Sequence, residues 1–314
     1  MSSGSVEGRT ITLGNGRSLD VLVAPPSDGA VGLISHHGTP GEASRFAPWA
    51  DSARERGLRL VGFSRPGYAG SSRHAGRTVA AVAADVAELA DALGIGTFLS
   101  IGRSGGGPHS IACAALLPER CLAATALVTI APWGATGLDW FDRMSQLNLD
   151  EFGAALRGEE ALRAWMADKG EQLRHVTGAE IADSIGDEMP DCDRAILTGE
   201  HAEEEAAGIR RALANGFDGW VDDDLAFTRD WGFELQGIHR PVRIWQGELD
   251  HLVSVAHGRW LAEHIPAATF NLAEGHGHLS LAEAHRDAIL DDLVAAAGLG
   301  GSSIRGLSGD QTRP

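Results

Sequence analysis

Ser104 is the residue of this chain whose surroundings best suit a nucleophile. It stands in the sequence GRSGG, residues 102–106, which matches the G-x-S-x-G turn that lifts a serine out of a strand end. The pentapeptide alone is a weak signal, because glycine and serine are common in this chain. Its context is stronger, since the apolar run 98–101 precedes it and Pro108 opens a helical pattern after it. The sequence therefore predicts a serine exposed at a strand-to-helix turn.

A serine hydroxyl is a poor nucleophile unless a histidine takes its proton and a carboxylate holds that histidine in one tautomer. Both residue types follow apolar runs later in the chain. Asp250 comes after the run 242–246, and Glu248 in the same loop and Asp139 after an earlier run are its rivals. These three are the candidate acids.

The base has two candidates, His276 and His278, in the segment EGHGHL after the apolar run 269–272. Acyl transfer also needs N–H donors at the place where negative charge develops on the substrate oxygen. The loop HGTPG, residues 37–41, follows another apolar run and can supply one backbone N–H. The second donor would be the N–H of Gly105.

These residues need elements that hold them, and the periodicity of the apolar residues predicts where those elements are. Short apolar runs predict buried strands at residues 19–24, 31–35, 58–63, 98–102, 126–131, 242–246 and 269–272. Helical spacing is found between and after them, at residues 46–56, 79–93, 108–117, 255–265 and 281–297. Strands that alternate with helices indicate an α/β fold, with a mostly parallel sheet covered on both faces.

The interval 138–237 interrupts this alternation. It is rich in Ala, Leu and Glu, so we predict a helical insertion between two parts of the core, 1–137 and 238–299. The insertion holds 24 acidic and 9 basic side chains and thus carries nearly all of the formal net charge of -17. Its acidic runs are predicted to be solvated, although acids that turn inward could select a cationic substrate. The tail 300–314 lacks periodicity and is predicted to be disordered.

Composition excludes several classes of protein. The chain has one lysine, Lys169, in an acidic stretch, which makes a P-loop and a Schiff-base cofactor site improbable. The net negative charge disfavours binding to nucleic acid. Three cysteines without a C-x-x-C pair encode neither a disulfide framework nor a thiolate metal site. No histidine spacing indicates a metal, so loops or helix surfaces are expected for His36, His37, His109 and His251. We expect no cofactor, no metal, no membrane association and a cytoplasmic location.

Five segments in order make the sequence resemble the α/β-hydrolase-fold serine hydrolases: HHGTPG, FSRPGYAGSS, GRSGGGP, GELDHLV and EGHGHLSL. The similarity covers residues 10–298. HGTPG and SRPGYAGS are similar to loops of the proline iminopeptidase and esterase branch, which has a helical cap. Two departures from that branch are Ser64, in place of aspartate, and Ala69, in place of glycine. The resemblance implies an α/β-hydrolase fold whose cap is the insertion 138–237.

The resemblance also implies a role for each matching position. Ser104 would be the nucleophile, Asp250 the orienting acid and His278 the base, in the chain order that this fold requires. His278 is preferred to the neighbouring histidine because the family's motif places the base directly before a hydrophobic residue. The oxyanion hole would be formed by the amides of Thr39 and Gly105.

Substrate-binding residues are predicted around this constellation: His37, Gly38, Arg103, Trp133 and Trp140. Arg103, directly before the nucleophile, is expected either to contact a substrate carboxylate or to pair with a nearby acid. The tryptophans of the insertion are expected mainly as packing contacts, with one or two of them at the substrate.

We therefore expect a hydrolase that cleaves an ester, thioester or amide of a small hydrophobic substrate through an acyl-enzyme. The alternatives are a proline iminopeptidase-type aminopeptidase, an acyl transfer or cyclisation in natural-product biosynthesis, and a ligand-binding protein of this fold. Haloalkane dehalogenases and epoxide hydrolases have aspartate at the position of Ser104, and epoxide hydrolases also need cap tyrosines. The one tyrosine here is Tyr68, outside the insertion, so both are disfavoured. The expected partner is a small-molecule substrate, and the sequence is compatible with a homo-oligomer.

Overall fold

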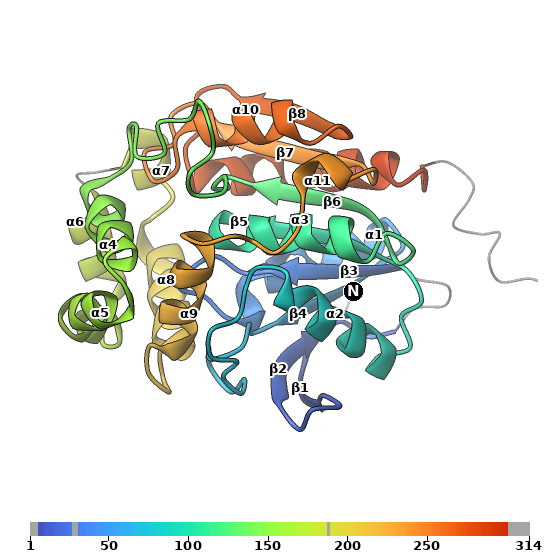
Figure 1. Ribbon diagram of the computed structural model, residues 1–314, viewed down its shortest axis with the longest axis horizontal. Coiled ribbons are helices and arrows are strands. Elements are labelled where there is room, and N and C mark those ends of the chain that lie inside the picture. The colour runs from blue at the N-terminus through green and yellow to red at the C-terminus, as the bar shows by residue number, and fades with distance from the viewer. Residues whose placement is uncertain (1–5, 27–30, 187–188, 301–314) are drawn as a thin grey trace, which may run out of the picture.

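An eight-stranded sheet runs through the centre of the computed structural model, which describes residues 6–26, 31–186 and 189–300 (Figure 1). Its strands are β1 (Glu7–Thr12), β2 (Ser18–Val23), β3 (Val31–His36), β4 (Leu58–Phe63), β5 (Phe98–Arg103), β6 (Cys121–Leu127), β7 (Val242–Gly247) and β8 (Ala268–Ala273). Their order is β1-β2-β4-β3-β5-β6-β7-β8. Only β2 pairs antiparallel with its neighbours, and all later pairs are parallel. The predicted α/β class with a mostly parallel sheet is confirmed.

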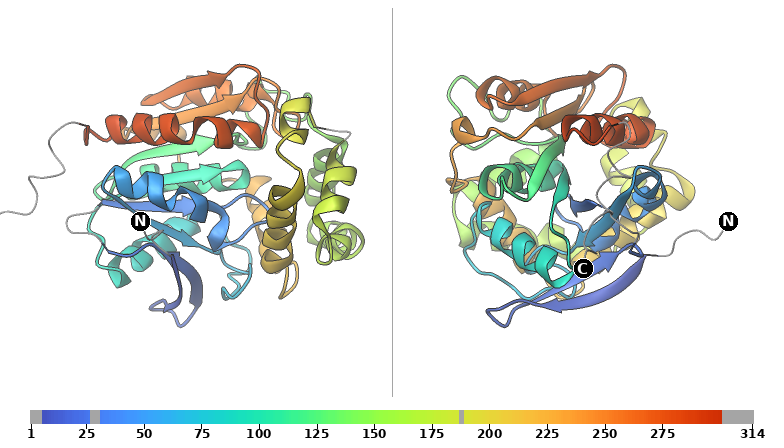
Figure 2. Two further views of the ribbon diagram at one scale, coloured as in Figure 1. Left: turned by 180° about the vertical axis from the view of Figure 1, so that it is seen from behind. Right: turned by 90° about the vertical axis from the view of Figure 1, so that its right-hand side faces the viewer.

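Helices cover both faces of this sheet (Figures 1 and 2). On one face lie α1 (Ala50–Glu55), with the 3₁₀ helix Ala43–Trp49 before it, and α11 (Ser280–Ala296). On the other face lie α2 (Ala81–Ala92), α3 (Gly107–Leu116) and α10 (Val255–His264). Successive strand residues point to opposite faces. Leu33 accordingly packs in the core shared with α11, and Ile34 packs in the core shared with α3.

Two strands differ from the expectation. The predicted strand 126–131 is wrong in its bounds, because β6 occupies Cys121–Leu127 and Val128 adopts a positive φ of 46° that ends it. Alanine has little β propensity, and β6 is rich in alanine. The apolar pattern therefore places the strand too late in the chain, over the more apolar residues that follow β6. Strand β1 was not predicted, because most of its residues are exposed and polar.

The segment between β6 and β7 contains α4 (Gln146–Leu156), α5 (Glu159–Leu173), α6 (Gly178–Gly186), α7 (Asp191–Arg194), α8 (Gly199–Ala212) and α9 (Asp218–Phe227). We call α4 to α9 the helical insertion. Figure 1 shows it across the end of the sheet at which β3, β5 and β6 finish. In parallel α/β sheets ligands bind at this carboxyl edge, so the helical insertion lies over the edge where a site is expected.

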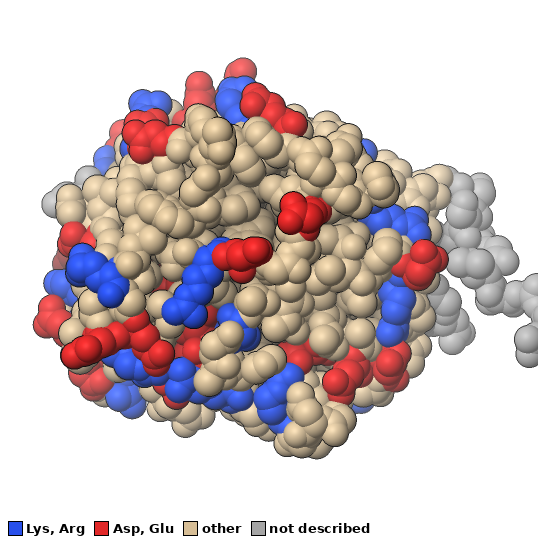
Figure 3. Space-filling view, viewed as in Figure 1, with Lys and Arg blue, Asp and Glu red and all other residues tan. Residues whose placement is uncertain are grey.

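Charges of both signs are interspersed on the visible surface at this end of the molecule (Figure 3). Within the described residues, none of the helices combines the length and the apolar character that a membrane span needs. The predicted disordered tail lies outside the described residues, apart from Gly300.

Candidate active site

Ser104 lies at a sharp turn between β5 and α3 with a φ of +54°, a left-handed conformation that is costly for a residue with a Cβ atom. Neighbouring glycines make this turn feasible. A Cβ at Gly102 would collide with the backbone of Gly106, and a Cβ at Gly106 would collide with the carbonyl of His36. The GRSGG sequence is therefore required by close backbone contacts, which hold Ser104 at the end of its strand.

His278 and Asp250 lie together at the same edge of the sheet. His278 Nδ1 is 2.9 Å from Asp250 Oδ2, and both side chains are buried. Asp250 Oδ1 accepts the backbone N–H groups of Leu252 and Val253, each at 2.9 Å, and Oδ2 also accepts from Gln246 at 3.2 Å. These donors hold the Asp250 side chain in one orientation. The carboxylate then selects the Nδ1–H tautomer of His278, which leaves Nε2 free to accept a proton.

The rival residues lie elsewhere. Glu248 is exposed and accepts the backbone N–H of Gly275 at 3.0 Å, and Asp139 is exposed. The His276 ring packs edge-on against the ring of His285, with 4.8 Å between the ring centroids. The structure thus brings His278 and Asp250 together, as the sequence predicted.

The loop 37–41 also lies close to the serine. A Cβ at Gly38 would lie 3.6 Å from the Cβ of Ser104, and a Cβ at Gly105 would collide with the Thr39 hydroxyl. The two predicted oxyanion residues, Thr39 and Gly105, are therefore in contact beside Ser104. His37 does not line the cavity. It donates from Nδ1 to the Gly38 carbonyl at 2.6 Å, and so shapes this loop instead of facing the substrate.

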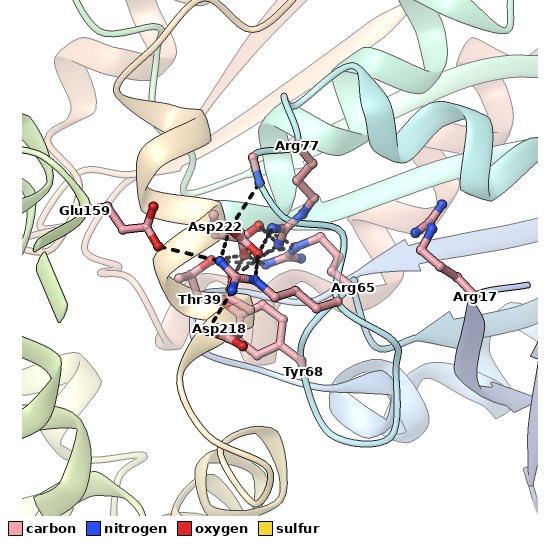
Figure 4. A network of polar contacts seen from close by, with 12 residues as sticks. Arg17, Thr39, Arg65, Tyr68, Arg77, Glu159, Asp218 and Asp222 are labelled. Atoms are coloured by element: carbon pink, nitrogen blue, oxygen red, sulfur yellow. Dashed lines mark hydrogen bonds and ion pairs between the residues drawn. The ribbon is translucent and has the colours of Figure 1, made fainter. Parts of the chain in front are cut away.

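A buried ion-pair network fixes the same loop to the helical insertion (Figure 4). Asp223 of α9 accepts from Arg65 at 2.6 Å, Arg77 at 2.7 Å, Tyr68 at 2.9 Å and Thr39 at 3.1 Å. Burial raises the pKa of Asp223, but the charges of Arg65 and Arg77 outweigh this effect and hold the pKa well below its usual value. Arg65 also donates to the carbonyl oxygens of residues 37 and 38. Asp223 and Arg65 thus hold the loop 37–41, the predicted oxyanion loop, in place.

The predicted solvation of the acidic run 222–224 is therefore wrong, because all three side chains are buried. The buried Asp224 oxygens accept no hydrogen bond from an N–H group of the described residues. Its neighbour is Glu151 of α4, which accepts from the indole N–H of Trp220 at 2.6 Å. Burial raises the pKa of Glu151 to about 7, and burial together with the charge of Glu151 raises the pKa of Asp224 well above its usual value. The pair therefore retains a proton near neutral pH.

Asp193 of α7 is a second carboxylate of the helical insertion that reaches an active-site loop. Its Oδ2 accepts the backbone N–H of His278 at 2.7 Å. Its Oδ1 accepts the N–H groups of Leu279 at 3.0 Å and Ser280 at 2.8 Å, and the Ser280 hydroxyl at 2.7 Å. Asp193 thereby caps the first turn of α11. Sequence reasoning missed it, because no local pattern links position 193 to a helix start 87 residues later.

A cavity of about 740 Å³ joins these residues. Ser104, His278, Gly38, Thr39 and Arg103 line it together with Trp220 of α9. Many other lining side chains are apolar, among them Leu147, Leu173, Val176, Ile181, Ile209 and Leu252. The predicted substrate contacts Trp133 and Trp140 are not among the lining residues. Trp140 is buried with its indole N–H bonded to the Ala131 carbonyl at 2.8 Å, and Trp133 packs against the Trp140 ring.

The expected surface placement of the histidines is wrong for His36 and His109, which are fully buried. Burial lowers the pKa of His109 to about 4 and lowers that of His36 well below its usual value, so both are neutral core residues. Among the described residues, no three His, Cys, Asp or Glu side chains gather as metal ligands would.

Comparison with known proteins gives the same fold. A family model described as "alpha/beta hydrolase fold" matches residues 33–163. The chain is 27% identical to the protein named "Putative carbamate hydrolase RutD" from Caulobacter sp. (strain K31), over 95% of this chain and 100% of that protein. Epoxide hydrolase A from Mycobacterium thermoresistibile superposes with a TM-score of 0.70 at 20% identity, covering 93% and 98% of the two chains. The enol-lactonase from Burkholderia xenovorans LB400 superposes with a TM-score of 0.65 at 20% identity, covering 92% of this chain and 100% of that chain. By its sheet order and these matches, the chain has the α/β-hydrolase fold.

Proposed function

We propose that this protein is a serine hydrolase that cleaves an ester, thioester or amide of a small, largely apolar substrate. The observation that carries the proposal is the Asp250–His278 contact of 2.9 Å at a cavity that Ser104 also lines. Asp250 holds the imidazole tautomer, and the left-handed turn presents the serine at the carboxyl edge of the sheet.

In the proposed reaction, His278 Nε2 takes the proton of Ser104 Oγ as that oxygen attacks the substrate carbonyl carbon. The backbone N–H groups of Thr39 and Gly105 stabilise the resulting oxyanion. His278 returns the proton to the leaving group when the carbonyl reforms, which leaves an acyl-enzyme on Ser104. Water then attacks the acyl carbon with His278 again as base, and the released acid frees the serine.

The apolar lining of the cavity supports a substrate with a hydrophobic body. An epoxide substrate has less support, because a serine stands where that chemistry uses aspartate, and the buried Tyr68 hydroxyl is engaged by Asp223. The aminopeptidase alternative also has less support. Two buried carboxyl groups line the cavity. Glu42 is paired with Arg211 at 2.9 Å, and Glu151 has a raised pKa and shares its environment with Asp224, so neither is an unpaired negative charge for a substrate ammonium. The name of the Caulobacter relative adds carbamates to the substrates worth assaying.

Covalent labelling tests the proposal. A fluorophosphonate should modify the wild-type protein at Ser104, as located by peptide mass spectrometry, and should not modify Ser104→Ala. Turnover of 4-nitrophenyl esters should be lost in His278→Ala and largely kept in the matched variant His276→Ala. An unlabelled wild-type protein, or the reverse order of the two histidine variants, would refute the assignment.

A further inference from the structure

Arg103, the last residue of β5, is a cavity-lining arginine that has no partner in the described part of the chain. It directly precedes Ser104 and lines the same cavity. Its Nε–H is buried with no acceptor, and neither of its other nitrogens forms a hydrogen bond or ion pair with a described residue. A guanidinium has five N–H donors, and those of Arg103 have no acceptor among the described residues at the wall of the cavity.

The carboxylates nearest to Arg103 are already engaged. Glu205 forms an ion pair with Arg45, which also lines the cavity. Asp193 accepts four hydrogen bonds from the start of α11. Glu283 pairs with Arg286 at 2.9 Å. The expectation that Arg103 pairs with a nearby acid is therefore not met.

Arg103 nevertheless remains a cation. Burial lowers its pKa to about 10, which still leaves it protonated at neutral pH. A partly desolvated charge without a counter-ion is unfavourable, and the structure provides no acceptor that would offset this cost. A ligand anion in the cavity would supply the missing acceptor.

We propose that Arg103 is an anion subsite, and that the substrate carries a carboxylate in addition to the bond that Ser104 attacks. This inference rests on the proposed function. A planar guanidinium binds a carboxylate through two parallel N–H bonds, which would orient the substrate as well as hold it. The apolar walls would then contain the body of the substrate, and the guanidinium beside the nucleophile would bind its charged end. The acidic character of the chain as a whole does not oppose this binding, because the acids near Arg103 are already paired.

Two pairs of esters test the inference and show which part of the substrate carries the charge. The first pair is 4-nitrophenyl pentanoate and 4-nitrophenyl hemiglutarate, which differ by a carboxylate at the end of the acyl chain. The second pair is phenyl acetate and 3-carboxyphenyl acetate, which differ by a carboxylate on the leaving group. The measured quantity is the ratio of kcat/KM for the charged ester to that for its neutral partner.

In at least one pair the Arg103→Gln variant should lower this ratio about tenfold or more, as expected for loss of a charged hydrogen-bonded contact. Arg103→Lys should retain part of the ratio. Arg229→Gln, which removes an exposed cation outside the cavity, should leave it unchanged. Equal ratios for wild type and Arg103→Gln in both pairs would overturn the subsite, provided that Ser104 is labelled by the fluorophosphonate. Failure of the labelling itself would instead refute the proposed function.

Discussion

Removal of the Asp193 carboxylate should have two separately measurable effects: a loss of stability, and a displacement of His278, the proposed base. In Asp193→Ala, the buried backbone N–H groups of His278, Leu279 and Ser280 lose the acceptor that now lies 2.7 to 3.0 Å away. Each buried N–H without an acceptor costs about 1–3 kcal/mol. Because water from the adjacent cavity can reach this loop, we expect the low end of that range, about 3 kcal/mol of unfolding free energy for the three groups.

The catalytic effect should be larger than this loss of stability suggests. Asp193 contacts the backbone of His278 itself, so its removal frees the proposed base, which has to reach the serine hydroxyl in the proposed reaction. A displacement of about 1 Å in a catalytic group can lower the rate roughly 100-fold. We therefore expect kcat for a 4-nitrophenyl ester to fall by about this factor with little change in KM, since Asp193 does not line the cavity.

Two variants make the experiment specific. Asp193→Asn keeps one acceptor oxygen and should retain part of both stability and kcat. Ser280→Ala removes the hydroxyl that donates to Asp193 but leaves the three backbone bonds, so it should lose some stability and keep most of kcat. Urea unfolding and steady-state kinetics at a temperature where every variant is folded provide the measurements. If Asp193→Ala loses stability while its kcat stays at the wild-type value, Asp193 only caps α11 and the positioning argument is wrong.

Two further predictions concern the other buried carboxylates. Asp223→Asn should lower the unfolding free energy by about 3–5 kcal/mol, because it leaves the guanidinium of Arg65 buried without a counter-charge and that of Arg77 with Asp222 alone, at 3.7 Å. A loss no larger than that of the exposed Asp51→Asn control in urea unfolding would contradict this. Glu151→Gln should raise the melting temperature more at pH 8 than at pH 5. Folding raises the pKa of Glu151 from 4.5 to about 7, so the folded protein holds a proton that the unfolded chain releases, and stability falls as pH rises through that window. Glutamine does not ionise and avoids the loss, so equal shifts at both pH values would refute the assignment.

The proximity of the proposed acid and base at the edge of the sheet was predictable from the sequence, because each candidate residue stands directly after a strand with a local signature. Ser104 has its glycine turn, and Asp250 and His278 follow apolar runs that became β7 and β8. Carboxyl ends of parallel strands meet at one edge of a sheet, so three local patterns were enough to bring the residues together.

The carboxylates of the helical insertion could not be predicted in this way. Asp222, Asp223 and Asp224 occupy successive positions of α9, and such a run looks the same whether the helix faces water or the core. What buries Asp223 is its docking against Arg65 and Arg77, which come from a loop about 150 residues earlier. The choice of Trp140 as a substrate contact is wrong for the same reason. Trp220 of α9 lines the cavity, and Trp140 packs into the core.

These carboxylates change the meaning of the charge on the helical insertion. Asp223 of α9 holds the loop 37–41 through Thr39 and Arg65. Asp193 of α7 holds the loop that carries His278 through the backbone N–H of that residue. Both loops contribute residues that line the cavity with Ser104, so the insertion contacts both parts of the candidate machinery. A helical layer that only covered a cavity would control access and leave the geometry of the sheet edge intact. Here the geometry of that edge depends on two buried acids that the helical insertion supplies. We therefore expect the candidate site to reach its working geometry only when the insertion is docked on the sheet.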